Sequence, residues 1–227
     1  MKIDFRFFSN QLLKSELLRS ASVLITGTVL AQLISILLQP VLRRFFSPGT
    51  FGTYSVYLSI VGIITVVSSL RYDDTIVLPK KDKESASVLF LSLSSNLIIC
   101  FLLFLCILIW GRKILLFLNI PSTFQISILY LVPLSVFLYN TYQCFNNWLI
   151  RKKKYYSVSL NKLLRRGSEG VAQISFALLK NSKGLIFSDI IGQSANVISA
   201  LIQSFKFGLS FKVISIRKLK YVMGKYS

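Results

Sequence analysis

Two arginines and a glutamate interrupt the apolar stretch LLRRGSEGVAQISFALL at residues 163–179. On a helix, the polar side chains of this region fall within roughly 40° of one direction. These residues are Lys162, Arg166, Glu169, Gln173 and Lys180, with Arg165 only slightly outside the set. A helix face that carries cations toward one end suits the head group of an anionic substrate.

Two other apolar stretches carry similar polar faces. One comprises Asp189, Gln193, Asn196 and Gln203, and a milder one comprises Thr28, Gln32, Ser35 and Gln39. An unpaired charge near the bilayer centre costs at least about 2.5–3.5 kcal/mol, so these faces should turn toward a bundle interior or a water-filled cavity. The candidate cavity residues are therefore Gln32, Gln39, Arg165, Arg166, Glu169, Gln173, Asp189, Gln193 and Asn196.

Three interpretations of the charged residues stay open. The first is packing, because Arg165 and Glu169 stand four residues apart, a spacing at which an ion pair forms on a helix. The second is a cavity with its cations toward the cytoplasm, which would accept an anionic head group. The third is a proton or cation site at Glu169 or Asp189. Asp189 also lies about one turn from the end of its stretch, which fits a simple surface position.

The composition is that of an integral membrane protein. Of 227 residues, 53% are apolar and 15% are charged, whereas soluble domains carry about 25% charged residues. Six stretches reach the length of about 20 residues that a spanning helix needs. They are residues 20–39, 51–70, 86–110, 124–150, 156–179 and 185–205. We expect an all-α bundle of six transmembrane helices, with a kink at Pro133.

The basic residues follow the alternation of these spans. The net charge is +19, from 27 basic and 8 acidic residues. Of the 27, 21 fall on the side of the N-terminus and only 6 on the other side. This asymmetry predicts that both termini are cytoplasmic. It also argues against nucleic-acid binding, because topology accounts for where the basic residues lie.

The two ends of the chain differ from the bundle. We expect residues 1–19 to be a cytoplasmic amphipathic segment and residues 206–227 to be a basic cytoplasmic tail, both lying on anionic lipid. Between them, Gly184, Ser188, Gly192 and Ala200 recur at multiples of four, a spacing that favours close helix packing.

No catalytic arrangement stands out in the sequence. The chain has no histidine, and its three cysteines, Cys100, Cys106 and Cys144, all lie in apolar stretches. This excludes the common zinc motifs, and we expect no cofactor and no metal. Asp73 and Asp74 raise the alternative of a metal-dependent glycosyltransferase, but the chain has no room for a nucleotide-sugar domain. We therefore expect that the protein is not an enzyme.

The order of several motifs resembles bacterial polysaccharide biosynthesis membrane proteins, the Wzx-type O-antigen and capsule flippases related to MATE exporters. The first group of matching features is Gln32, Pro40, Arg44 and the SP-x-x-FG element of Ser47, Pro48, Phe51 and Gly52. The second group is RYDDTIVLP, with Arg71 and Pro79, then LVPLSVFLYNTYQCFNNWLIRKKKY, with Trp148 and Arg151, then GLIFSDIIGQ. The resemblance covers roughly residues 20–205.

The resemblance implies the first lobe of a MATE-like flippase in the bacterial inner membrane. Such a protein moves undecaprenyl-pyrophosphate-linked oligosaccharide units to the outer leaflet, and it works beside other polysaccharide-assembly membrane proteins. Family members have twelve or more spans, so a chain of six implies a second half or a homodimer partner. The alternatives are a polymerase-like membrane enzyme of surface-polysaccharide assembly and a non-functional truncated product.

Overall fold

The computed structural model describes residues 5–68, 73–117 and 126–210. Every regular element in these ranges is a helix. They are α1 (Phe5–Phe45), α2 (Pro48–Ser68), η1 (Asp74–Val77), α3 (Asp82–Phe117), α4 (Ile126–Leu129), α5 (Val132–Arg151), α6 (Tyr155–Leu178) and α7 (Gly184–Lys206). Arg71, most of the predicted tail, and the predicted span ends Leu70 and Phe124 lie outside the described residues.

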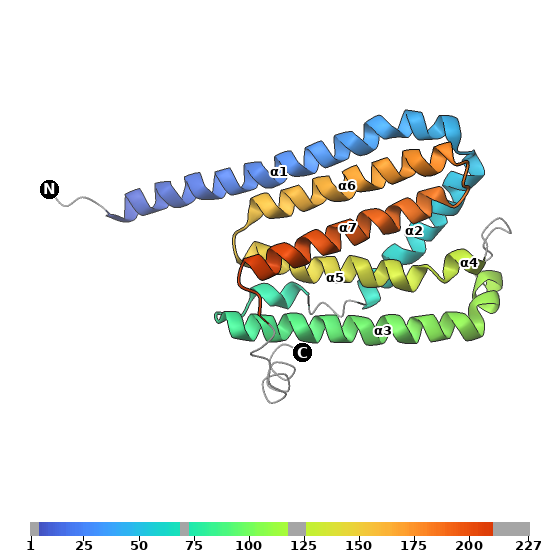
Figure 1. Cartoon of the computed structure of the whole chain (residues 1–227). Coiled ribbons are helices and arrows are strands. Elements are labelled where there is room, and N and C mark those ends of the chain that lie inside the picture. The colour runs from blue at the N-terminus through green and yellow to red at the C-terminus, as the bar shows by residue number, and fades with distance from the viewer. Residues whose placement is uncertain (1–4, 69–72, 118–125, 211–227) are drawn as a thin grey trace.

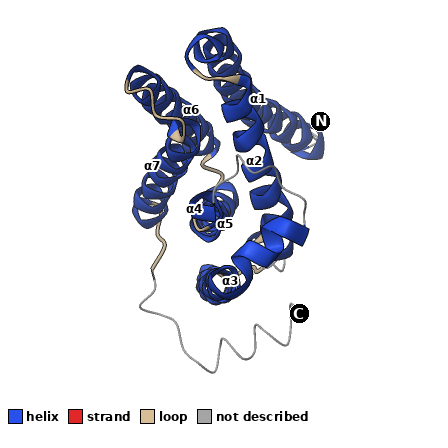
Figure 2. Ribbon diagram, turned by 90° about the vertical axis from the view of Figure 1, so that its right-hand side faces the viewer, coloured by secondary structure: helices blue, strands red, loops and turns tan. Residues whose placement is uncertain are grey.

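Five long helices lie side by side in the order α1, α6, α7, α5 and α3 (Figure 1). This order is not the chain order, since α1 packs on α6 and α5 packs on both α3 and α7. The remaining long helix, α2, starts beside the end of α1 and crosses behind the layer toward α3. Viewed along the helices, α1 and α2 lie on one side, α6 and α7 on the other, and α5 between them (Figure 2).

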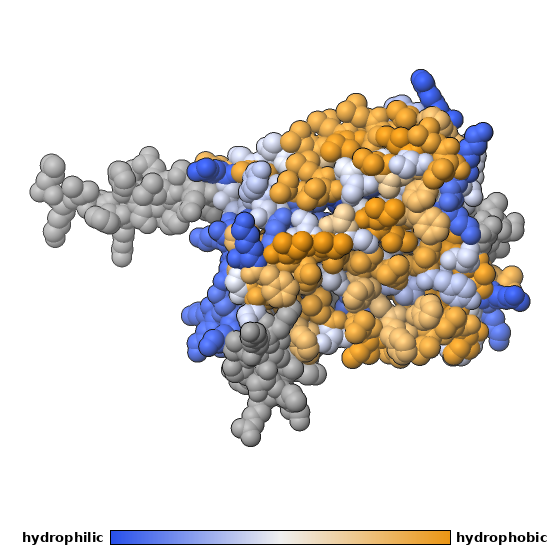
Figure 3. All heavy atoms as spheres, viewed as in Figure 1, coloured by the Kyte–Doolittle hydropathy of each residue, from blue (hydrophilic) through white to orange (hydrophobic). Residues whose placement is uncertain are grey.

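The surface confirms an all-α membrane bundle. Within the part of the chain that the structure describes, five helical segments are long and apolar enough to span a membrane. They are Leu18–Phe45, Pro48–Val66, Asp82–Phe117, Ile126–Arg151 and Gly184–Lys206. Apolar side chains form a broad band on the visible face, with polar side chains at its two ends (Figure 3). The sixth expected span, α6, is 24 residues long, but its charged residues make it too polar to count among these apolar segments. It packs against α1 and α7, and its exposed face carries apolar side chains such as Leu164, Val171 and Leu178.

Two helix boundaries differ from the sequence-based expectation. Residues 5–19 continue without a break into the first span, so α1 is a single helix of 41 residues with Pro40 inside it. The fourth span does not merely kink. It is broken at Tyr130 and Leu131 into α4 and α5, because Pro133 sits in the first turn of α5, where its missing N–H costs no helical hydrogen bond.

The SP-x-x-FG element is a helix start. Ser47 caps α2, since its Oγ accepts a hydrogen bond from the backbone N–H of Thr50 at 3.3 Å. Pro48 follows as the first helical residue. Phe46 and Phe51 then pack edge to face with ring centroids 6.4 Å apart, which fixes the angle at which the chain enters α2. Gly52 has open space around it, so nothing in the described structure requires a glycine there.

Helices α6 and α7 approach closely at Gly192, as the small-residue pattern predicted. A Cβ placed on Gly192 would lie 2.8 Å from Cβ of Glu169 and 3.0 Å from the backbone oxygen of Arg165. The absence of a side chain therefore lets α7 lie directly against the charged part of α6.

Replacing Gly192 with alanine should separate these helices and lower the free energy of unfolding by about 1–3 kcal/mol. Gly167→Ala is the matched control, because Gly167 also lies in α6 but has nothing within 4 Å of an added Cβ. Tryptophan fluorescence during thermal unfolding in detergent measures both variants. Equal unfolding temperatures would contradict the close approach.

Candidate functional site: a polar groove between α1, α2 and the central helices

Four adjoining pockets form a groove along the inner faces of α1, α2, α5 and α6, and we call it the polar groove. Their volumes are about 390, 520, 620 and 210 Å³. Tyr139, Gln143 and Arg165 line both of the first two pockets. Gln39, Tyr54 and Gln173 line both of the last two. Leu58 lines the second, third and fourth pockets, and Arg166 lines the first and fourth, so the four pockets are parts of a single groove.

The 390 Å³ pocket is the cationic part of the groove. Lys162, Arg165 and Arg166 line it from α6, opposite Thr28 and Gln32 of α1. Lys162 donates a hydrogen bond through Nζ to Thr28 Oγ1 at 2.9 Å. All three basic side chains are only partly buried, so they can meet a ligand in the groove.

We call the surface formed by Lys162, Arg165 and Arg166 the cationic wall, and both of its arginines form ion pairs. Arg166 pairs with Glu169 at 2.9 Å, three residues along the same helix. Arg165 reaches across to Asp189 of α7 at 3.4 Å. The predicted pair between Arg165 and Glu169 is therefore wrong, because Arg165 points toward the neighbouring helix. The surface position considered for Asp189 is also wrong, since that residue is 1% exposed.

Each carboxylate also accepts a hydrogen bond from a carboxamide one turn further along its helix. Gln173 donates to Glu169 Oε1 at 3.3 Å, and Gln193 donates to Asp189 Oδ2 at 2.6 Å. Buried carboxylates with both a cation and an amide partner are tolerated in an apolar bundle, whereas an unpartnered one would not be. Three cations face two carboxylates here, so the wall keeps a surplus positive charge, carried by Lys162.

The structure brings most of the predicted residues into this groove. Gln32 and Asn196 line the 390 Å³ pocket, and Gln193 lines the 520 Å³ pocket. Gln39 and Gln173 line the two pockets nearer the Ser47 turn. Asp189 lines none of the four pockets and lies behind Arg165 as its counter-ion.

The sequence did not single out the contribution of α5. Tyr139, Gln143 and Asn146 face the groove, but the polar residues of α5 are spread around the helix and form no single face. The reason is that α5 contacts α2, α3, α6 and α7. Asn140 lines the 520 Å³ pocket and also donates to Ser68 Oγ at 2.8 Å and to Asn96 Oδ1 at 3.3 Å, so it joins α5 to α2 and α3.

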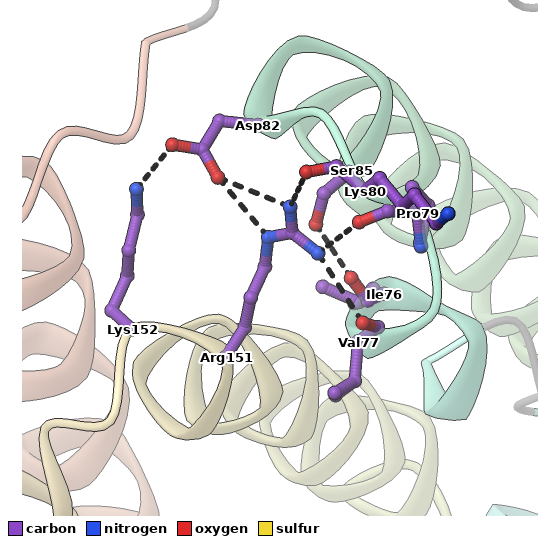
Figure 4. Close-up of polar contacts among 8 residues, drawn as sticks. All are labelled: Ile76, Val77, Pro79, Lys80, Asp82, Ser85, Arg151 and Lys152. Atoms are coloured by element: carbon purple, nitrogen blue, oxygen red, sulfur yellow. Dashed lines mark hydrogen bonds and ion pairs between the residues drawn. The ribbon is translucent and has the colours of Figure 1, made fainter. Parts of the chain in front are cut away.

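At the end of α5, Arg151 holds the segment that connects α2 to α3 (Figure 4). Its guanidinium donates to the backbone oxygens of Val77 at 3.2 Å and Lys80 at 3.1 Å, and also to that of Pro79. It also bonds Asp82 Oδ1 at 3.1 Å, and Lys152 bonds the other oxygen of Asp82 at 2.5 Å. This arrangement gives two of the motif positions, Pro79 and Arg151, a structural role.

The other motif positions divide between the core, the surface and the lining of the groove. Trp148 is fully buried in a core with Val88, Leu89 and Phe145. Pro40 and Arg44 are exposed and line none of the four pockets. Pro48 and Phe51 line the 620 Å³ pocket. Among the residues that the structure describes, no three His, Cys, Asp or Glu side chains lie together as metal ligands.

Comparison with known proteins gives one match. A family model described as polysaccharide biosynthesis protein matches residues 17–226, nearly the whole chain. The matched range contains all of the polar groove. No curated protein and no solved structure matches the chain significantly.

Removing Arg165 alone should lower the stability of the protein more than removing Arg165 and Asp189 together. Arg165→Gln leaves Asp189 buried and unpaired, which should cost about 3–5 kcal/mol of stability. Arg165→Gln combined with Asp189→Asn removes both charges and should recover most of that loss. Thermal unfolding of the two variants measures the difference. A single variant as stable as the double variant would show that the pair does not form.

Arg151 and Asp82 should contribute unequally to stability. Asp82 is half exposed, so Asp82→Asn should cost less than about 1 kcal/mol. Arg151→Lys keeps the charge but loses the fork of donors to the carbonyls, which should cost about 2 kcal/mol or more. Unfolding temperatures compare the two variants, and equal losses would mean that the ion pair, rather than the carbonyl contacts, holds the segment.

Proposed function

The chain belongs to the polysaccharide biosynthesis protein family, and on that basis we propose that it carries a lipid-linked oligosaccharide across the bacterial inner membrane. In this proposal the carrier lipid is undecaprenyl pyrophosphate, and the oligosaccharide is a repeat unit of O-antigen or capsule. The chain acts as a transporter and makes or breaks no covalent bond in the substrate.

One observation carries the proposal: a cationic wall lies within an apolar bundle and faces a groove. Arg165 and Arg166 each have a carboxylate partner, whereas the one partner of Lys162 among the described residues is the hydroxyl of Thr28. A pyrophosphate would supply the missing negative charge through charge-assisted hydrogen bonds, which are stronger than those between neutral groups.

The shape of the groove suits a substrate with a polar head and an apolar tail. Helices α1 and α2 meet at the Ser47 turn and diverge from there (Figure 1). The 620 Å³ and 210 Å³ pockets lie between them and include apolar side chains such as Leu42 and Leu58. The head group would occupy the groove, while the lipid tail would stay in the bilayer between the diverging helices.

The direction of loading follows from the distribution of charge. The end of the bundle that holds the Lys152–Lys154 turn carries most of the basic residues, and basic loops stay in the cytoplasm. Lys162 lies two turns into α6 from that end. The cationic pocket is therefore placed to receive the pyrophosphate from the cytoplasmic leaflet, with both termini on that side.

Lys162→Gln tests the proposal because it removes the surplus cation without leaving a buried carboxylate unpaired. A charge-assisted hydrogen bond contributes about 1.5–3 kcal/mol, so export should fall about tenfold or more. Surface polysaccharide is measured in cells that depend on this chain for export, with protein levels in the membrane quantified alongside.

Two variants control this experiment. Lys162→Arg keeps the charge and should retain export. Lys183→Gln loses the same charge at a residue outside the groove, where Nζ bonds Ser127 Oγ at 3.0 Å, and it should also retain export. Normal export by Lys162→Gln, or an equal loss with Lys183→Gln, would overturn the proposed role of the cationic wall.

A further inference from the structure

The 390 Å³ pocket is lined by more polar side chains than the binding of a phosphate requires. Ten of its eleven lining residues have polar side chains, Ala31 being the exception, and none of the eleven is a carboxylate. Besides the three cations and Thr28, the polar residues are Gln32, Tyr139, Tyr142, Gln143, Asn146 and Asn196. Carboxamides and hydroxyls both donate and accept hydrogen bonds. Such a set matches a ligand that is itself rich in hydroxyl groups.

A second observation concerns a buried amide of this pocket. Asn196 is 2% exposed, and it lines this pocket beside Tyr142. Its Oδ1 has no hydrogen-bond partner among the residues that the structure describes. Gln193, one turn away in α7, likewise has no such partner for Oε1. An unsatisfied buried acceptor is costly, and a ligand hydroxyl would relieve that cost.

The neighbouring pockets offer different chemistry. Asp73 and Asp74 line the 520 Å³ pocket, and their negative charge opposes an anion there. The 620 Å³ pocket is faced by Phe46, Phe51 and Leu185 as well as by polar groups. Of the four pockets, the 390 Å³ pocket is the one that combines Lys162, Arg165 and Arg166 with carboxamides and has no carboxylate in its lining.

We propose that this pocket binds the sugar attached directly to the phosphate of the lipid-linked substrate, with Asn196 and Gln143 contacting its hydroxyls while Lys162, Arg165 and Arg166 contact the phosphate. The proposal rests on the function proposed above and adds a specificity site to it. A volume of 390 Å³ lies at the low end of the range for small-ligand pockets. It accommodates one phosphorylated sugar, and the rest of the oligosaccharide extends along the groove.

A hydroxylated phosphate ester has two sources in a membrane, a sugar phosphate and a glycerol phosphate from a phospholipid head group. Four soluble probes separate them: glucose 1-phosphate, N-acetylglucosamine 1-phosphate, glycerol 3-phosphate and inorganic phosphate. The full chain is reconstituted in nanodiscs of neutral lipid, and each probe is titrated while the phosphorus NMR line width is recorded, a measurement that detects weak binding.

At least one sugar phosphate should bind about tenfold more tightly than inorganic phosphate and more tightly than glycerol 3-phosphate. One hydrogen bond changes affinity by about two- to tenfold. Asn196→Leu should therefore remove most of the preference for the sugar and leave phosphate affinity unchanged. Gln143→Leu, at a half-buried position, is the second variant in case Asn196→Leu does not fold. Asn161→Leu removes a buried amide outside the groove lining and should keep the preference.

Each other outcome has a definite meaning. Equal binding of sugar phosphates and inorganic phosphate, dependent on Lys162, would overturn the sugar site and leave the cationic wall in place. Tightest binding of glycerol 3-phosphate would assign the pocket to a phospholipid head group instead. Binding of none of the probes at millimolar concentration would overturn both the sugar site and the proposed function. An intact preference in Asn196→Leu and Gln143→Leu would show that these amides do not contact the sugar.

Discussion

Buried carboxylates inside an apolar layer need a cation beside them, and this requirement governs how α6 and α7 pack. Arg165 finds Asp189 only because α7 lies against α6, and α7 lies there because Gly192 has no side chain. The same contact buries Glu169 beside Arg166. Close packing of α6 and α7 and neutralisation of their charges therefore depend on each other. Without the close approach the charges would lie unpaired in lipid, and without the ion pairs the charged helices would not pack together there.

This constraint also shapes the groove. Once two arginines are neutralised on one side of α6, their remaining donors and Lys162 face α1 and α5. Helix α5 lies at the centre of the bundle, and it adds tyrosines and carboxamides to this face while its other polar residues join α2 and α3. At its end, Arg151 holds the connection between α2 and α3. The groove is thus supported by contacts on several sides of one central helix.

Much of this arrangement could be predicted from the sequence, because helical periodicity places Gln32, Arg166, Glu169 and Gln193 on definite faces. The partners of long side chains could not be predicted. The spacing of Arg165 and Glu169 favoured a pair within α6, and the actual partner depends on which helix lies alongside. The role of Arg151 could not be predicted either. Its acceptors are mostly backbone oxygens, which every residue carries and which residue types therefore do not reveal. The polar residues of α5 face several neighbours and form no recognisable face.

If the groove is hydrated and takes an anion, a cysteine placed in it should react with a water-soluble thiol reagent, and a bound anion should protect it. One variant, Gln143→Cys, places a cysteine in the groove. The control variant, Leu164→Cys, replaces a residue that is 43% exposed and lies outside the groove lining, at a similar distance from the same end of the bundle. Both are made in a chain whose three native cysteines are alanine and are treated with a charged, membrane-impermeant thiol reagent. We expect that the groove cysteine reacts, that pyrophosphate slows its reaction, and that the cysteine at Leu164 stays unlabelled. A groove cysteine as unreactive as the one at Leu164 would contradict this expectation.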